Sequence, residues 1–412
     1  MHLTHCTRTI AGDLYAAGGD VPSHCRATDA RRSTGRGTRR ALPGLSFPPP
    51  RSYLPAIRTS VLHPSARPML RLHEYTYHRP STLAEALDLV TGNEDAVAIA
   101  GGTDLMPNMK HRLFTPRHLV ALKGVAELHG IGVADAEGNA VEEDSPSAAQ
   151  LVVGAAETLT AVAKSPLVRR IAPALAEAAG HVAGPQIRNA GTMGGNLCLD
   201  TRCTYYNQSF FWRQALGFCL KKDGDVCHVT RVGKKCVAAH SADTPPVLIT
   251  LAAAADLASA QGVRTVTVDE FFVANGEWNT VRRPDELVVR IRIPLPGPGV
   301  RTAYRKVRQR NSVDFPLLSI AAAADMAEDR TARSLSLVVS ALGARPRVVT
   351  GLDRIVAGNR LGDVADAVAA QAFKQCHPLE NIIVDPDWRR AMVPVYVRRA
   401  LDELAVAPRA AA

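Results

Sequence analysis

The sequence predicts an α+β fold in two parts, with the larger part before a turn-rich boundary and the smaller part after it. Helix-like and strand-like apolar patterns alternate from residue 69 onward. The segment PLPGPG at 294–299 concentrates proline and glycine at one point. Residues 1–68 lack such patterning. We therefore expect one domain over 69–297 and a second over 301–407.

The first expected element is a helix that begins at a capping box, Thr82-Leu83-Ala84-Glu85, and continues with apolar residues at helical spacing. The later elements are read from apolar runs and their flanking turns. Expected strands lie at 97–100, 151–155, 263–268, 286–293 and 335–341. Expected helices lie around 159–164, 168–179 and 246–256, with two more near the C-terminus.

The extension 1–68 carries most of the positive charge. Ten Arg and three Asp give it a net charge of +7, so the other residues hold only +3 of the total of +10. A nucleic-acid surface should be basic on the folded domain, so this distribution argues against nucleic acid. The extension is rich in Arg, Pro, Ser and Gly, and we expect it to be disordered. It superficially resembles a transit peptide, but translation starting at Met69 is the reading that we favour.

No apolar run reaches the about 20 residues that span a bilayer. The best candidate among the apolar runs, VLITLAAAA at 247–255, is short and is followed by Asp256, so it predicts a buried helix. No secretion signal is evident, so we expect no membrane association and a reducing cytoplasmic compartment.

Two glycine-rich loops are candidates for ligand binding. The first is AIAGGTDLMPNMK at 98–110, and the second is QIRNAGTMGGNLC at 186–198. Converging backbone N–H groups at such loops can bind anions, although a simple tight turn explains either loop alone. Two loops with hydroxyl and amide groups suit a long ligand with a pyrophosphate, for example FAD.

Four cysteines are concentrated in one segment, CTYYNQSFFWRQALGFCLKKDGDVCHVTRVGKKC at 203–236. Without a secretion signal, disulfides are disfavoured. The gaps between these cysteines do not match the two close pairs of a structural zinc site, whereas an iron–sulfur cluster tolerates wider spacing. Lys221, Lys222, Lys234 and Lys235 would offset the charge of a thiolate-ligated cluster, although solvated surface lysines are the simpler account. From spacing alone, a cluster, zinc and free thiols all remain open.

Three segments together resemble the FAD-binding medium subunits of the xanthine dehydrogenase/CO dehydrogenase family of molybdenum hydroxylases. They are AGGTDLMPNMK, AGPQIRNAGTMGGNLCLDTRCTYYNQS and HSADTPPVLITLAAAADL, and the resemblance extends over about 69–407. The cysteine segment resembles the insert of one branch, the beta subunit of 4-hydroxybenzoyl-CoA reductase. The resemblance implies a two-subdomain FAD-binding domain with a [4Fe-4S]-binding insert at about 198–240, followed by a smaller C-terminal α/β domain.

The same resemblance implies the residues of two cofactor sites. Cys203, Cys219, Cys227 and Cys236 would ligate the [4Fe-4S] cluster, leaving Cys198 as a buried thiol. FAD would contact the two loops and two later residues, an aspartate at the ribityl chain and a lysine at the flavin edge. These FAD contacts are Ala98, Ile99, Ala100, Gly101, Gly102, Thr103, Asp104, Leu105, Thr192, Gly194, Gly195, Asn196, Asp243 and Lys306.

The implied function is electron relay in an oxidoreductase complex, with no catalytic residue on this chain. The implied partners are a molybdenum-cofactor large subunit and a [2Fe-2S] small subunit, in a heterotrimer or a dimer of heterotrimers. Ferredoxin would donate electrons for reductive dehydroxylation of 4-hydroxybenzoyl-CoA. One alternative is a hydroxylase subunit that passes electrons outward. A further alternative is a zinc-stabilised binding module without flavin.

Overall fold

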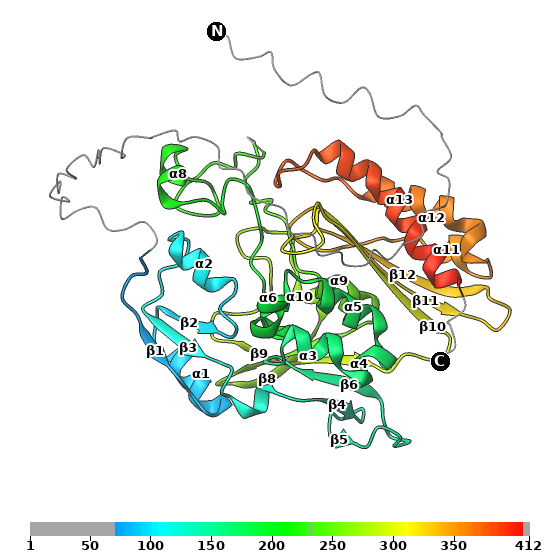
Figure 1. Cartoon of the computed structure of the whole chain (residues 1–412), viewed down its shortest axis with the longest axis horizontal. Coiled ribbons are helices and arrows are strands. Elements are labelled where there is room, and N and C mark those ends of the chain that lie inside the picture. Colours follow the sequence, from blue (N-terminus) through cyan, green and yellow to red (C-terminus); the bar gives the residue numbers. More distant parts are fainter. Residues whose placement is uncertain (1–70, 231, 407–412) are drawn as a thin grey trace, which may run out of the picture. The chain divides into compact units, whose positions relative to one another are not determined.

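The computed structural model describes residues 71–230 and 232–406, so the extension expected over 1–68 lies outside the described residues. The described residues form a three-stranded, a six-stranded and a four-stranded sheet. Figure 1 shows these sheets with their associated helices. Among the described residues, no helix combines the length and the hydropathy needed to cross a membrane.

The first sheet is parallel, with strand order β1-β3-β2, and α1 packs on it. Thr82 caps α1 by accepting a hydrogen bond from the backbone N–H of Glu85 (3.2 Å). Glu85 accepts from the N–H of Ser81 rather than that of Thr82, so only the first half of the expected capping box forms. The elements are β1 Thr76–His78, α1 Leu83–Thr91, β2 Ala96–Ile99, α2 Leu105–Lys110, β3 His118–Ala121 and the 3₁₀ helix η1 Ala126–Leu128.

The six-stranded sheet is antiparallel, in the order β5-β4-β6-β9-β7-β8. In its centre, Leu151 of β6 pairs with Ile293 of β9, and Val153 pairs with Ile291; all four side chains are fully buried. Its strands are β4 Ile131–Ala134, β5 Ala140–Val141, β6 Gln150–Gly154, β7 Ala254–Ser259, β8 Gly262–Thr267 and β9 Leu287–Pro294. The helices of this part are α3 Leu159–Lys164, α4 Pro166–Ile171, α5 Pro173–His181, α6 Pro185–Ala190, α7 Met193–Leu197, α8 Phe210–Ala215, α9 Thr244–Thr250 and α10 Val268–Phe271.

The helix expected near 246–256 is wrong in its second half, because α9 ends at Thr250 and β7 follows. Ala252 has a positive φ of 51°, which breaks the helix. Beyond it, Ala255 and Leu257 are fully buried in a strand between β9 and β8. Burial in the centre of a sheet here outweighs the helical propensity of alanine.

The helix expected over 168–179 is also interrupted. Pro173 begins α5 and cannot donate the backbone hydrogen bond that would continue α4. The segment therefore forms two helices that meet at Ala172, which is fully buried.

The C-terminal part contains an antiparallel sheet in the order β10-β11-β12-β13 and a helical layer in which α13 packs on β10 and β11. The expected strand 335–341 is the end of β12, whereas β10 and β11 are not predicted from sequence. Ala321, at the middle of β11, joins the core of the preceding part. The elements are β10 Val300–Val307, β11 Leu318–Met326, β12 Ala332–Ser340, β13 Arg347–Val348, α11 Asp353–Val356, α12 Leu361–Gln375 and α13 Pro386–Ala405.

Two carboxylates share one arginine where α5, β10 and α13 meet. Arg305 contacts Glu177 at 3.5 Å and Glu403 at 2.5 Å. Burial, together with the charge of Glu403, raises the pKa of Glu177 to about 7 despite Arg305.

This shift predicts stability that decreases with pH. Because the pKa of Glu177 is higher in the folded than in the unfolded chain, the folded state holds a proton that the unfolded state has lost. We expect the free energy of unfolding to fall by about 1–2 kcal/mol, after a discount for solvent screening, between about pH 4.5 and 7. Denaturant unfolding at several pH values would measure this. Glu177→Gln should flatten that dependence, and an unchanged slope would contradict the assignment.

Candidate functional site

The two glycine-rich loops lie against each other. The first, residues 98–105, connects β2 to α2, and its Gly101 approaches the end of α6 so closely that a Cβ there would lie 2.1 Å from the carbonyl oxygen of Ala190. The adjacent Gly102 has a positive φ of 67°, which favours glycine. Glycine is therefore required at both positions, by close approach at one and by backbone conformation at the other.

The close approach makes a strong prediction. Gly101→Ala must push the loops apart, and overpacking of this kind costs about 1–3 kcal/mol. We expect reduced stability together with at least tenfold weaker FAD binding, because about 1.4 kcal/mol lost at the site corresponds to tenfold. Thermal unfolding and flavin titration would measure both effects. Gly132→Ala is the matched control, since an added Cβ there meets nothing within 4 Å; equal effects of the two changes would contradict the loop contact.

The second loop leads into α7 and connects onward to α9. Thr192 caps α7 by accepting from the N–H of Gly195 (3.1 Å). Asn196 accepts hydrogen bonds from the N–H (3.2 Å) and the hydroxyl (2.7 Å) of Thr244, the first residue of α9. The loop is therefore anchored beside Asp243, which directly precedes α9.

Asp243 and Lys306, which sequence places 63 residues apart, form a buried ion pair of 2.9 Å. Their side chains are only 4% and 1% exposed. The hydroxyl of Tyr304 donates to the other Asp243 oxygen (2.6 Å), and Lys306 also donates to the carbonyl of His181 (3.0 Å). Lys306 therefore does not form a surface salt bridge. It belongs to a buried cluster of polar residues from α5, the start of α9 and β10.

Burial dominates the protonation equilibria of this pair. It raises the pKa of Asp243 and lowers the pKa of Lys306, while the opposite charge of each partner counteracts the shift. Burial also lowers the pKa of the neighbouring His181, with help from Arg308 and Lys306. His181 is therefore neutral near pH 7, and its buried Nδ1 has no hydrogen-bond partner within the described structure. This buried cluster thus contains the Asp243–Lys306 ion pair and one polar atom, His181 Nδ1, without a hydrogen-bond partner in the described part of the chain.

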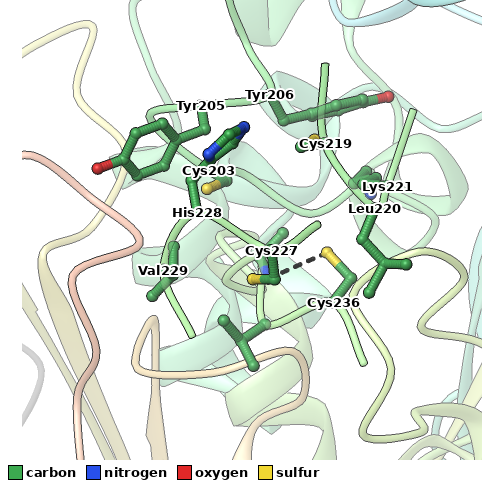
Figure 2. Close-up of a pocket in the computed structure, with 12 residues that line it drawn as sticks. Cys203, Tyr205, Tyr206, Cys219, Leu220, Lys221, Cys227, His228, Val229 and Cys236 are labelled. Carbon is green, nitrogen blue, oxygen red and sulfur yellow. Dashed lines mark hydrogen bonds between the residues drawn. The ribbon is translucent and has the colours of Figure 1, made fainter. Parts of the chain in front are cut away.

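The four cysteines of the 203–236 segment line a single cavity (Figure 2). Cys219, Cys227 and Cys236 are buried, Cys203 is half-buried, and none of the four forms a disulfide. Tyr206, Lys221 and His228 also line the cavity. Across residues 71–230 and 232–406, no group of three or more His, Cys, Asp or Glu is positioned to hold a single metal ion.

Backbone pairing explains how such widely spaced cysteines meet. Arg202 and Ala239 exchange two hydrogen bonds (2.8 and 2.7 Å), which places the two ends of the segment side by side. Between them, the N–H groups of Lys222 (2.8 Å) and Gly224 (3.2 Å) donate to the carbonyl of Cys219 and form a tight turn. Linear spacing alone does not reveal this arrangement.

The environments of the thiols differ. Burial raises the pKa of Cys203, and it raises that of Cys236 to about 11 although Lys221 opposes the shift. Burial also acts on Cys227, but hydrogen bonds from Thr230 and nearby backbone N–H groups outweigh it and lower the pKa. Compared with Cys203 and Cys236, Cys227 is thus more readily converted to the thiolate that binds iron or zinc.

Cys198 is half-buried against the core formed by the central sheet and does not line the cavity. Burial raises its pKa. The sequence analysis expected a buried thiol, whereas a part of the Cys198 surface stays accessible.

Several residues that hold these sites were not predicted from sequence. Tyr304 could have been found, because it lies two residues before Lys306 on one strand and therefore on the same face. Asn381 could not have been found, since it lies far away in sequence, in the loop before α13. Its side-chain amide donates to the carbonyl of Val237 (2.7 Å), and its backbone carbonyl accepts from the N–H of Thr204 (3.0 Å). Gly276 also lies outside the cysteine segment in sequence, and its N–H donates to the carbonyl of Cys236 (2.9 Å).

The two parts of the chain match two family models. Residues 73–296 match the FAD binding domain in molybdopterin dehydrogenase, and residues 302–404 match the CO dehydrogenase flavoprotein C-terminal domain. The carbon monoxide dehydrogenase medium chain of Hydrogenophaga pseudoflava is 28% identical over 80% of this chain and 96% of its own length. The FAD-binding subunit of an Escherichia coli aldehyde oxidoreductase is 34% identical over 60% of this chain and 76% of its own.

Solved structures show the same architecture. A chain of the carbon monoxide dehydrogenase of Hydrogenophaga pseudoflava aligns with a TM-score of 0.63 at 26% identity, over 81% of this chain and 97% of the other. A chain of quinoline 2-oxidoreductase from Pseudomonas putida 86 aligns with a TM-score of 0.64 at 24% identity, over 81% and 98% respectively. The second likeness concerns the fold alone.

Proposed function

Because the chain belongs to the family of FAD-binding medium subunits of molybdenum hydroxylases, we propose that it binds FAD and relays electrons inside a multi-subunit complex. The observation that carries this proposal is the continuity of the FAD site. The first loop contacts the second through Gly101, the second is bonded to the start of α9 through Asn196, and Asp243 is paired with Lys306. Bound FAD would supply a centre that accepts and releases electrons.

Each part of this site has a proposed role. Residues 98–105 and the loop Thr192–Asn196 would hold the pyrophosphate and ribose arms. Both combine glycines with a threonine hydroxyl, and the second loop adds the amide of Asn196. Asp243 would accept a hydrogen bond from the ribityl chain. Lys306 would keep that carboxylate ionised and supply a positive charge near the flavin edge, where a cation favours an electron-rich ring.

We also propose that Cys203, Cys219, Cys227 and Cys236 ligate a [4Fe-4S] cluster. Four thiols converge on one cavity, and their residues come from both ends and the middle turn of the segment. Four cysteine thiolates are the usual ligand set of a [4Fe-4S] cluster. This arrangement also explains why cysteines spaced so irregularly in sequence occur together.

The direction of electron flow separates two candidate functions. The relatives include subunits of carbon monoxide dehydrogenase, xanthine dehydrogenase and aldehyde oxidoreductase, and they favour a hydroxylase-type subunit that passes electrons outward. They favour this function over the reductive dehydroxylation of 4-hydroxybenzoyl-CoA that the cysteine segment implies. The four-cysteine cavity is the one observation in favour of that reductase, since an added one-electron centre suits entry of electrons from ferredoxin.

In either function we propose the same partners. A large subunit would hold the molybdenum cofactor and a small subunit the [2Fe-2S] centres, because the relatives are described as medium chains or FAD-binding subunits. The substrate would bind on the large subunit, so the present chain would contribute electron transfer rather than bond-making chemistry.

Anaerobic purification of the chain with its partner subunits tests the proposal. We expect one FAD per chain and, beyond the iron of the small subunit, about four iron and four sulfide. Reduction of the flavin by carbon monoxide, a purine or an aldehyde would support the outward-flowing hydroxylase, and reduction by ferredoxin would support the reductase. Stoichiometric zinc in a colourless chain would overturn both and establish a binding module.

A further inference from the structure

One lysine differs from the others in the cysteine segment because it is buried at the wall of the cavity. The side chain of Lys221 is only 4% exposed, and it lines the cavity beside the cysteines (Figure 2). The side chain of Lys222 is 37% exposed, and Lys234 and Lys235 are exposed as well. The sequence shows four equivalent lysines, whereas the structure separates one of them from the solvent.

Several contacts hold the Lys221 ammonium in place. It donates to a carboxylate oxygen of Asp200 (2.7 Å), to the hydroxyl of Thr201 (2.5 Å) and to the carbonyl of Gly276 (2.6 Å). It also lies 4.6 Å from the centre of the Tyr206 ring. Three acceptors satisfy all three of its N–H groups, so the charge cannot rotate toward solvent. Burying an ammonium is costly unless it is paired and hydrogen-bonded, and here it is both.

The counter-ion of Lys221 does not itself line the cavity. Asp200 is 20% exposed, does not line the cavity and leaves its second carboxylate oxygen without a hydrogen-bond partner among the described residues. Gly276, which holds the ammonium from another direction, is in close contact with Cys236: a Cβ on Gly276 would lie 2.8 Å from the cysteine sulfur. The fixed positive charge, unlike its compensating carboxylate, therefore belongs to the wall of the cavity that the thiols share.

We propose that Lys221 is a fixed charge that raises the reduction potential of the iron–sulfur group held by the four cysteines. This rests on the proposed [4Fe-4S] cluster. A reduced cluster with four thiolates carries one more negative charge than the oxidised cluster, so a buried ammonium beside it stabilises the reduced form more. The electron comes from or returns to a one-electron protein carrier, and the change requires no proton. The exposed lysines are screened by water and contribute little.

Redox titration of the cluster in the assembled complex, followed by electron paramagnetic resonance, tests this inference. In Lys221→Met, reduction should become at least tenfold less favourable, which corresponds to about 59 mV for one electron. Lys221→Arg keeps the charge and should restore most of the native potential. Lys222→Met is the matched control and should shift the equilibrium by less than about threefold, because exposed charges are screened.

A second variant covers the case in which Lys221→Met fails to assemble the cluster. Asp200→Asn removes the compensating carboxylate but keeps the ammonium, so the potential should rise, opposite to the effect of Lys221→Met. A purely structural lysine would not give shifts of opposite sign. An intact cluster whose potential changes in neither variant would overturn the inference, and so would equal shifts in Lys221→Met and Lys222→Met. Absence of iron from the unmodified chain would instead reject the proposed cluster itself.

Discussion

Replacement of Cys219 by serine is expected to remove nearly all of the about four iron atoms of the proposed cluster while most of the FAD remains bound. Cys219 is buried, lines the cavity and forms the turn that brings the middle of the segment to its ends. A serine hydroxyl does not ionise to replace the thiolate ligand. The FAD loops at 98–105 and 192–196 lie outside this segment, so flavin binding should persist. Iron and flavin analysis of the purified complex would measure both contents.

Cys198→Ser is the matched control for this experiment. Cys198 precedes the segment, packs on the core of the central sheet and is absent from the cavity wall. This variant should keep both the iron and the flavin. If Cys198→Ser loses the iron while Cys203→Ser retains it, the ligand set is displaced by one cysteine.

Lys306→Met is expected to cause the largest loss of stability among the charge changes considered. It leaves the buried carboxylate of Asp243 without its cation, and breaking a buried ion pair from one side costs about 3–5 kcal/mol. The hydrogen bond from Tyr304 remains but does not neutralise the charge. We expect a lower free energy of unfolding in denaturant titration and poor retention of FAD.

Two further variants separate stability from cofactor binding. Arg398→Met disrupts an exposed ion pair, in which the side chains of Arg398 and Asp366 are 45% and 86% exposed. This change should lower the free energy of unfolding by less than about 1 kcal/mol. Combining Asp243→Asn with Lys306→Met removes both charges and should recover much of the stability, whereas flavin binding should stay weak. Full recovery of flavin in the double variant would show that the pair only stabilises the fold.

Much of the candidate site could be predicted from local sequence. The loop containing Gly101 and Gly102 follows a strand as expected, whereas the helices α2 and α7 that follow the two loops were not predicted. The roles of Asp243, Lys306 and the four cysteines came from the resemblance to a family. Their mutual positions could not be predicted, since the contacts that create them join segments up to 177 residues apart.

The sequence by itself determined the turn-rich segment PLPGPG, the segments rich in glycine and cysteine, and the family to which the chain belongs. Such features depend on neighbouring residues, whose effects on turns and backbone conformation are local. Only the tertiary structure decided that the run after Thr250 becomes strand β7, that Tyr304 joins Asp243, and that Lys221 alone among four lysines is buried beside the thiols. The physical reason is that burial and electrostatics depend on residues distant in the chain, and their free energies exceed the local preferences that sequence patterns report.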